Sequence, residues 1–328
     1  MSEKVNWDKL KFISMLAVVI IHVSARFLLL QSDQLNYWAL FFNQISRFSV
    51  PVFLVASGYG LVVSGKDQQS YTFFIIERAK KVLPMFLVAS FFYYVMFAHN
   101  IHSIFTIREL LVILTGRSYY HLYFIVILFM CYLLFPLMCK LVKWNTNLTL
   151  LFAFGIQLVS QLLGMSQRIM ITEYNFLNWI FYFVLGIYLA VSNFEFRISF
   201  FPSVFIVLFS LVLVLCTSFL LYVRTKNIPV ATTTMSPVVT LFSISCINLL
   251  LNYPWKIDKV LSLNISLLFY LVHPFFVAFF AKVIDTNHNK SFIAFLTLLI
   301  LTITFSILAS WIINLGSNIA KKTIEIIR

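Results

Sequence analysis

The feature that most constrains this chain is a series of apolar runs, each about 20 residues long, separated by short charged clusters. A helix of about 20 residues crosses a hydrocarbon core of about 30 Å. A membrane β-barrel would show segments of about 10 strictly alternating residues, and runs such as Phe12–Ile21 do not alternate. Because 61% of the 328 residues are hydrophobic and 11% are charged, a water-soluble globular fold is excluded. We therefore predict an all-α polytopic integral membrane protein, with residues 1–328 forming one transmembrane domain.

The apolar runs predict ten membrane-spanning helices. The N-terminal run is too long for a signal-peptide core and has no small-residue cleavage site, so we expect it to remain in the mature protein. The ten ranges are Leu10–Leu30, Tyr37–Ser64, Val82–Ala98, Tyr119–Leu141, Leu148–Leu163, Phe176–Ser192, Phe201–Val223, Met235–Leu251, Leu261–Val283 and Ser291–Leu315.

The net charge of +13 is distributed unevenly between these ranges. With a cytoplasmic N-terminus, inner segments hold about twice as many Lys and Arg residues as outer segments, so the positive-inside rule places both termini in the cytoplasm. The four cysteines lie within apolar runs and form no C-x-x-C pair, which indicates small hydrophobic side chains and no metal site: Cys131, Cys139, Cys216 and Cys246.

Ionisable residues inside membrane spans are costly and therefore mark candidate sites. In the first range, Lys11 and His22 are eleven residues apart, close to three helical turns, and Asp8 and Arg26 fall within about 60° of the same face. At 1.5 Å per residue, His22 lies about 16 to 18 Å beyond the inner membrane edge, near the bilayer centre. A single buried His is also found as a packing residue. Its three ionisable neighbours favour a role in proton transfer.

The second range contains Arg47, followed by Pro51, Ser57 and Gly58. Arg47 is expected to face the protein interior or an aqueous cavity, because exposing its charge to lipid is expensive. Ser57 and Gly58 are candidate binding residues. Together with Pro51 they are explained equally well by a helix kink and a close contact between helices.

A basic cluster precedes the third range, in what we expect to be an inner loop ending at Pro84, the start of the next helix. Its residues Arg78, Lys80 and Lys81 are either the orientation signal of the positive-inside rule or ligands for the phosphates of a cytosolic cofactor.

Five further candidates depend on whether they face a cavity. They are His121, Tyr123, Ser266, Tyr270 and His273, and interfacial aromatic belts also account for the tyrosines. All eleven acidic residues fall in loops or at the edges of the predicted spans, and Asp8 and Glu173 are the two retained as cavity candidates. Proton- and sodium-coupled transporters commonly use intramembrane carboxylates, so this distribution weighs against a transporter.

At these residues the sequence resembles acyltransferase family 3, the membrane O-acyltransferases. Asp8, Lys11 and His22 are similar to the family's pattern of Asp, a basic residue, and His eleven positions later. The resemblance spans nearly the whole chain, with Lys11 in place of the commoner Arg, Leu54 where a second Phe is usual and Tyr123 where Trp is usual. The other similar residues are Arg47, Val50, Pro51, Phe53, Ser57, Gly58, Arg78, Lys81, Pro84, His121, Leu122, Phe124, the segment 183–186, Ser266, Tyr270, Leu271, Val272, His273 and Pro274.

This resemblance implies transfer of an acyl group, most often acetyl, from cytosolic acyl-CoA to a hydroxyl of a glycan or other envelope acceptor, in a bacterial cytoplasmic membrane and without a metal. His22 is then expected to act as general base or to relay the acyl group, with Lys11 and Arg47 stabilising negative charge near the thioester. Arg78, Lys80 and Lys81 are expected to bind the CoA phosphates. A non-enzymatic transporter or flippase for a glycan or lipid-linked sugar, and a membrane scaffold, are the alternatives.

Overall fold

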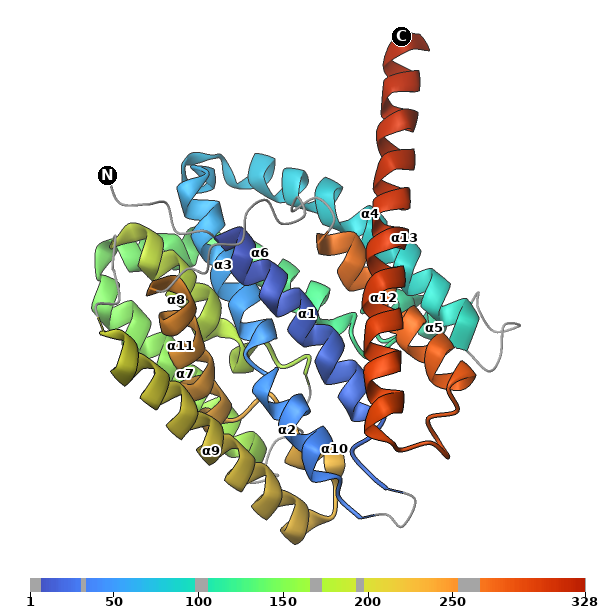
Figure 1. Ribbon diagram of the computed structural model, residues 1–328. Coiled ribbons are helices and arrows are strands. Elements are labelled where there is room, and N and C mark those ends of the chain that lie inside the picture. The colour runs from blue at the N-terminus through green and yellow to red at the C-terminus, as the bar shows by residue number, and fades with distance from the viewer. Residues whose placement is uncertain are drawn as a thin grey trace. The chain divides into compact units, whose positions relative to one another are not determined.

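The computed structural model describes residues 7–30, 34–97, 106–165, 173–192, 198–252 and 266–327; the side chains of Asp8 and of residues 317–327 lie outside this description. The described residues are almost entirely helical (Figure 1), and one isolated β-bridge joins Leu29 to Leu35. The elements are α1 (Trp7–Ala25), α2 (Tyr37–Ile45), α3 (Ser49–Val63), η1 (Lys66–Gln68), α4 (Tyr71–Phe97), α5 (Ile107–Leu114), α6 (Tyr123–Trp144), α7 (Thr146–Met165), η3 (Phe176–Asn178), α8 (Ile180–Val191), α9 (Phe200–Thr225), α10 (Ile228–Ala231), α11 (Pro237–Asn252), α12 (Ser266–Val283) and α13 (Phe292–Ile327).

Seven helical segments of the described chain are long and apolar enough to cross a membrane: Tyr37–Val63, Tyr71–Phe97, Tyr123–Trp144, Thr146–Met165, Phe200–Thr225, Ser266–Val283 and Phe292–Gly316. The other three predicted spans correspond to α1, α8 and α11. These are helical, but α8 and α11 have only 12 and 16 residues, and α1 begins with Asp8, Lys9 and Lys11. The all-helical class is therefore confirmed for the described residues, whereas ten spans and cytoplasmic termini stay predictions.

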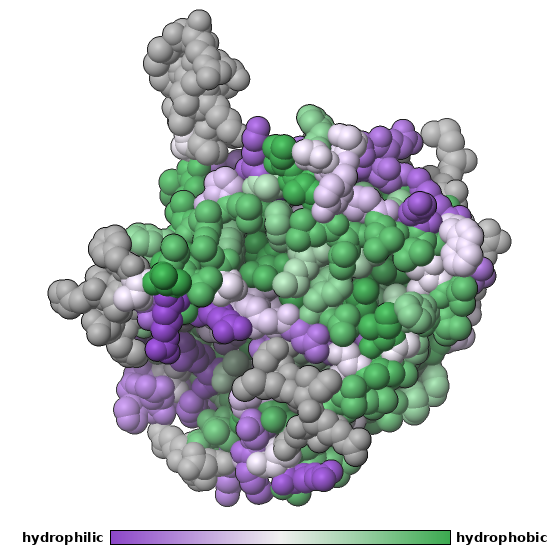
Figure 2. Space-filling model, turned by 180° about the vertical axis from the view of Figure 1, so that it is seen from behind, coloured by the Kyte–Doolittle hydropathy of each residue, from purple (hydrophilic) through white to green (hydrophobic). Residues whose placement is uncertain are grey.

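Large apolar side chains cover much of the face shown in Figure 2. Phe201 of α9 and Ile293 of α13 are 82% and 76% exposed, and Val88 of α4 is 71% exposed. Water disfavours so much contiguous apolar surface, whereas lipid tails solvate it. The surface therefore agrees with the hydropathy of the helices in indicating a multi-pass membrane protein.

The helices form two compact units. Unit 1 comprises Met1–Ser49, Ile198–Thr234 and Leu241–Arg328, and unit 2 comprises Val50–Arg197 and Met235–Thr240. In unit 1, α1 packs against α2, α12 and α13 (Figure 1). Val19 and Val23 of α1 are fully buried, because this helix is enclosed by its neighbours over most of its length.

The second predicted span is interrupted at residues 46–48, between α2 and α3. Pro51 lies in the first turn of α3 and has no N–H to donate to the carbonyl of Arg47, four residues earlier. Within the interruption, Arg47 N donates to Gln44 O and Ser49 N to Ser46 O, so the bonds reach three residues back as in a 3₁₀ turn. The break leaves Arg47 outside regular helix.

The prediction of an inner loop that ends at Pro84 is wrong. Helix α4 begins at Tyr71, so Glu77, Arg78, Lys80 and Lys81 are helical and Pro84 lies inside the helix. Glu, Arg and Lys are good helix formers, and their charge interrupts the apolar pattern without interrupting the helix. Pro84 removes one backbone hydrogen bond, a loss that helices in apolar surroundings tolerate when neighbouring groups compensate.

Two glycines set a close helix crossing in unit 2. A Cβ added to Gly58 of α3 would lie 2.3 Å from the Phe183 carbonyl oxygen, and one added to Gly186 of α8 would lie 2.1 Å from the Val55 carbonyl oxygen. The two backbones therefore touch, as small residues permit in membrane proteins. The structure thus supports the packing explanation of Gly58.

We predict that Gly58→Ala and Gly186→Ala each destabilise the protein by roughly 1–3 kcal/mol, because the helices must separate to admit the methyl group. Gly60→Ala is the matched control on α3, where an added Cβ meets nothing within 4 Å. Since Ala favours helix over Gly by about 0.8–1 kcal/mol, the control is expected to be neutral or stabilising. Thermal unfolding in detergent measures both, and equal stability of all three variants would contradict the crossing.

Candidate active site

Two histidines from distant parts of the sequence lie side by side in unit 1. His22 is in the last turn of α1, and His273 is in α12. Their ring centroids are 5.3 Å apart with an interplanar angle of 29°. His273 is fully buried, whereas His22 is partly accessible. The structure therefore brings His22 and His273 into one site within unit 1.

The tautomer of His273 follows from its hydrogen bond. Its Nδ1 lies 3.2 Å from the Phe269 carbonyl oxygen, and the ring also bonds to the Tyr270 backbone. Pro274 has no N–H for the Tyr270 carbonyl, so this His side chain compensates for the helix bond that the proline removes. A carbonyl oxygen only accepts, so Nδ1 carries the proton, and the neutral ring has its lone pair at Nε2. The Tyr270 ring centroid is 5.8 Å away.

Arg47 lies in the interruption between α2 and α3. Its Nε and Nη2 donate to Asn43 Oδ1 at 3.1 and 2.6 Å, and its Nη1 donates to Thr234 Oγ1 at 3.0 Å. Arg47 is also one of the groups that interact electrostatically with His22, together with His273 and Arg26. The helix break thus places a cation beside the histidine pair.

Three residues of this network were not predicted: Asn43, Ser24 and Thr234. Asn43 is fully buried, and its Nδ2 donates to the Ile21 carbonyl and to Ser24 Oγ, both at 3.0 Å. Asn43 could have been predicted from the sequence, because it lies inside an apolar run four residues before Arg47, and residues at this spacing share a helix face. The prediction considered ionisable side chains and so passed over an uncharged amide.

The other candidates on α1 lie away from the histidine pair. Lys11 and His22 are separated along the continuous helix by about 16 Å, at 1.5 Å per residue. Met15 and Val18, both buried, occupy the same face between them, so that face is not polar along its whole length. Asp8 lies in the first turn of the same helix, and its side chain lies outside the described residues.

Arg26 follows the end of α1 and is exposed. Its carbonyl accepts a 2.7 Å hydrogen bond from Lys290 Nζ, which lies between α12 and α13. Partial burial, reinforced by the Arg26 charge, lowers the pKa of Lys290 from its usual value. Ser266, another candidate of unit 1, is the first residue of α12.

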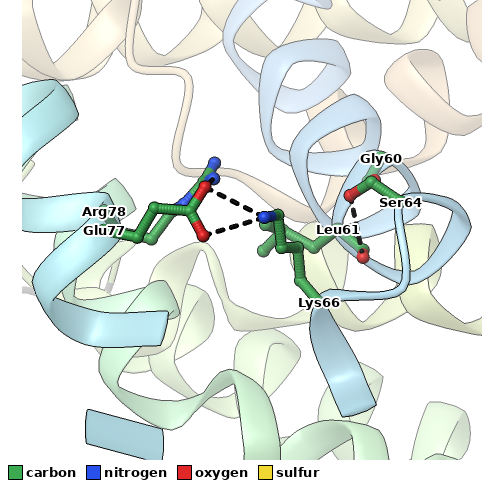
Figure 3. Close-up of polar contacts among 6 residues, drawn as sticks. All are labelled: Gly60, Leu61, Ser64, Lys66, Glu77 and Arg78. Carbon is green, nitrogen blue, oxygen red and sulfur yellow. Dashed lines mark hydrogen bonds and ion pairs between the residues drawn. The ribbon is translucent and has the colours of Figure 1, made fainter. Parts of the chain in front are cut away.

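The basic cluster of α4 belongs to unit 2 and divides into two kinds of residue. Arg78 and Lys66 share the carboxylate of Glu77 (Figure 3), and the Arg78 side chain is only 12% exposed. In the same view, the Ser64 hydroxyl donates to the Gly60 and Leu61 carbonyls at the end of α3. Lys80 and Lys81 are exposed. Arg78 is therefore engaged within the protein, whereas the two lysines are accessible to a ligand.

The remaining candidates of unit 2 lie in aromatic or polar surroundings. His121 is 1% exposed, and its ring centroid lies 4.9 Å from that of Tyr93 and 5.8 Å from that of Tyr119. Ser57 of α3 is partly accessible and lies near the Tyr132 hydroxyl. Tyr123 begins α6, and its ring centroid is 5.9 Å from Trp179.

Glu173 has an exposed side chain, and its backbone carbonyl accepts from Trp179 Nε1 at 2.9 Å. The neighbouring Tyr174 hydroxyl donates to the Gly116 carbonyl at 2.9 Å. Burial raises the pKa of Tyr174 to about 12, so this phenol keeps its proton at neutral pH. The two hydrogen bonds from Trp179 and Tyr174 therefore explain the conformation of the segment around Glu173 without a role in catalysis.

The sixteen candidate residues divide equally between the units. Unit 1 holds His22, Lys11, Arg47, Asp8, Arg26, Ser266, Tyr270 and His273, and unit 2 holds Arg78, Lys80, Lys81, Ser57, Gly58, His121, Tyr123 and Glu173. Within unit 1 the structure brings His22, Arg47 and His273 together, with Tyr270 beside His273.

Comparison of the sequence with known proteins identifies one family. The family model of acyltransferase 3, described as an acyltransferase domain, matches residues 4–311. No curated protein and no solved structure gives a significant match to the chain. The match confirms the resemblance seen in the sequence and covers the segments that contain His22, Arg47 and His273.

Proposed function

The chain belongs to the acyltransferase 3 family, and from that premise we propose that it transfers an acyl group, acetyl in the first instance, from cytosolic acyl-CoA to a hydroxyl of a glycan or other cell-envelope acceptor. The observation that carries this proposal is the contact between His22 and His273 beside Arg47. The apolar helices support a membrane location for the protein, and we propose the bacterial cytoplasmic membrane.

His22 acts as the general base in this proposal. It removes the proton from the acceptor hydroxyl as the oxygen attacks the thioester carbonyl carbon. Collapse of the tetrahedral intermediate forms the new ester and breaks the C–S bond, and the departing thiolate takes the proton from His22. The neighbouring His273, whose Nδ1 proton is fixed by a carbonyl, stacks on the His22 ring and thereby restricts its orientation.

Arg47 stabilises the negative charge that develops on the thioester oxygen. Its three hydrogen bonds to Asn43 and Thr234 hold the guanidinium in place before the reaction begins. Lys11 lies too far along α1 to contact the same oxygen. We therefore assign Lys11 to the phosphate end of the donor, whose uncharged pantetheine arm would extend along α1 towards His22.

We predict that His22→Ala lowers kcat for acyl transfer by at least about 100-fold, the lower end of what general base catalysis contributes. The measurement follows labelled acetyl-CoA and an acceptor glycan with purified protein. His288→Ala is the control, because this His side chain is 81% exposed and pairs with Asp285 outside the site. A folded His22→Ala protein with wild-type kcat contradicts the base assignment.

The same assay separates the enzyme from a flippase. An acyltransferase consumes the thioester and releases free CoA in proportion to acylated acceptor. A transporter leaves labelled acetyl-CoA intact while labelled glycan crosses a vesicle membrane that contains the purified protein. Observing that crossing without thioester cleavage refutes the proposed reaction.

Donor binding gives a separate prediction. Replacing both Lys80 and Lys81 with Ala is expected to raise the KM for acetyl-CoA several-fold with little change in kcat, because exposed ammonium groups bind phosphates as point charges. The matched control replaces Arg224 and Lys282, exposed cations in the last turns of α9 and α12. An equal rise in KM for both double variants shows a general charge effect and rejects the assignment.

A further inference from the structure

We propose that Asn43 is a positioning residue for acyl transfer, which holds the His22 turn of α1 and the guanidinium of Arg47 in a fixed relation. This inference rests on the proposed function, since it assigns Asn43 no contact with substrate. It follows from a continuous set of hydrogen bonds within unit 1 that runs from Ile21 and Ser24, in the turn that carries the proposed base, to the proposed oxyanion-stabilising residue Arg47.

The amide nitrogen of Asn43 fixes the end of α1. Both of its hydrogens are used, one donated to the Ile21 carbonyl and one to Ser24 Oγ, each at 3.0 Å. The Ser24 hydroxyl donates in turn to the Ile21 carbonyl at 3.1 Å. Ile21 and Ser24 flank His22 in the sequence, so these bonds restrain the turn that carries the imidazole.

The amide oxygen of Asn43 fixes Arg47. It accepts from Nε and Nη2 of the guanidinium, a two-point contact that sets the plane of the fork as well as its distance. Gln44 Nε2 donates to the same oxygen at 3.3 Å, and Thr234 Oγ1 accepts from the third guanidinium nitrogen. Amide and hydroxyl oxygens orient the guanidinium without carrying a formal charge that would cancel its own.

The chemistry of the network requires an amide at position 43. A carboxylate could still accept from Arg47, but it has no hydrogen to donate to the Ile21 carbonyl. An aliphatic side chain provides neither bond. The opposite orientation of the amide would set its oxygen against the Ile21 carbonyl and its NH₂ against Arg47, so the network itself fixes which atom faces which partner.

A purely structural role predicts different behaviour from a positioning role. A buried amide with satisfied hydrogen bonds stabilises any fold, and its loss lowers the amount of folded protein without changing the rate of each folded molecule. Misplacement of the base relative to the oxyanion contact lowers the chemical rate of protein that remains folded, because catalysis depends on orientation. The ratio of kcat to folded protein therefore distinguishes the two roles.

The test compares Asn43→Asp with Asn248→Ala in purified, detergent-solubilised full-length protein. Asn248 is the matched control, because it is also buried in unit 1 and donates to a serine, Ser203 Oγ, at 3.1 Å. Asn43→Asp is expected to lower kcat per folded molecule by about 100-fold, while the KM for acetyl-CoA stays within about two-fold of wild type. Asn248→Ala is expected to lower Tm and leave kcat unchanged.

Ser24→Ala keeps the test decisive where Asn43→Asp fails to fold. It removes one hydroxyl from the His22 turn and leaves the Asn43 bond to Ile21 in place, so Tm is expected to be near that of wild type and kcat to fall by less than in Asn43→Asp. Wild-type kcat in folded Asn43→Asp, or in Ser24→Ala where the first variant is unfolded, overturns the inference. An equal loss of kcat in Asn248→Ala overturns it as well.

Measuring His22→Ala in the same assay distinguishes failure of the Asn43 positioning role from failure of the proposed function. If His22→Ala is inactive and the Asn43 and Ser24 variants keep wild-type kcat, the positioning role fails and the proposed function stands. If His22→Ala itself keeps wild-type kcat, the proposed function fails first.

Discussion

Backbone groups in a hydrocarbon environment have no water to bond to, so each helix interruption must be compensated by the protein itself. Two prolines of this chain create such a need near the histidine pair. Pro51 removes the donor for the Arg47 carbonyl, and the chain responds with a short 3₁₀ break at residues 46–48. Pro274 removes the donor for the Tyr270 carbonyl, and the His273 ring bonds to the backbone there. A candidate residue lies at each interruption, Arg47 at the first and His273 at the second.

The same dependence applies to the polar side chains of unit 1, which are held by hydrogen bonds within the protein. Arg47 leaves regular helix at the break, but Asn43 in the preceding turn of α2 and Thr234 from a distant segment bind its guanidinium. The same Asn43 binds the end of α1. A buried network of this kind is favourable only when its members are satisfied, and satisfaction also fixes their geometry. The hydrogen bonds that offset the free-energy cost of burying these polar groups therefore also fix their positions.

The sequence predicted the features that depend on local pattern. Apolar run length gave the helical class, and the eleven-residue spacing of Lys11 and His22 identified the helix that carries the candidate base. Contacts between residues far apart in the sequence could not be predicted. His22 contacts His273, 251 residues later, and Arg47 bonds to Thr234, 187 residues later. The start of α4 was misplaced because charge was treated as a helix boundary, although Glu77, Arg78 and Lys80 are all compatible with helix.

The distribution of polarity along α1 also bears on the kind of donor that would fit. Its first turns carry Asp8, Lys9 and Lys11, its middle presents Met15 and Val18 on the Lys11 face, and its last turn carries His22. Along this helix the order is charge, then about 16 Å over which the same face is buried in apolar contacts, then an imidazole. Acyl-CoA has the same order of polarity, with phosphates at one end, an uncharged pantetheine arm and a reactive thioester at the other. Lys11 and His22 are therefore too far apart to act on one atom, and the proposed function assigns them to the two ends of one donor.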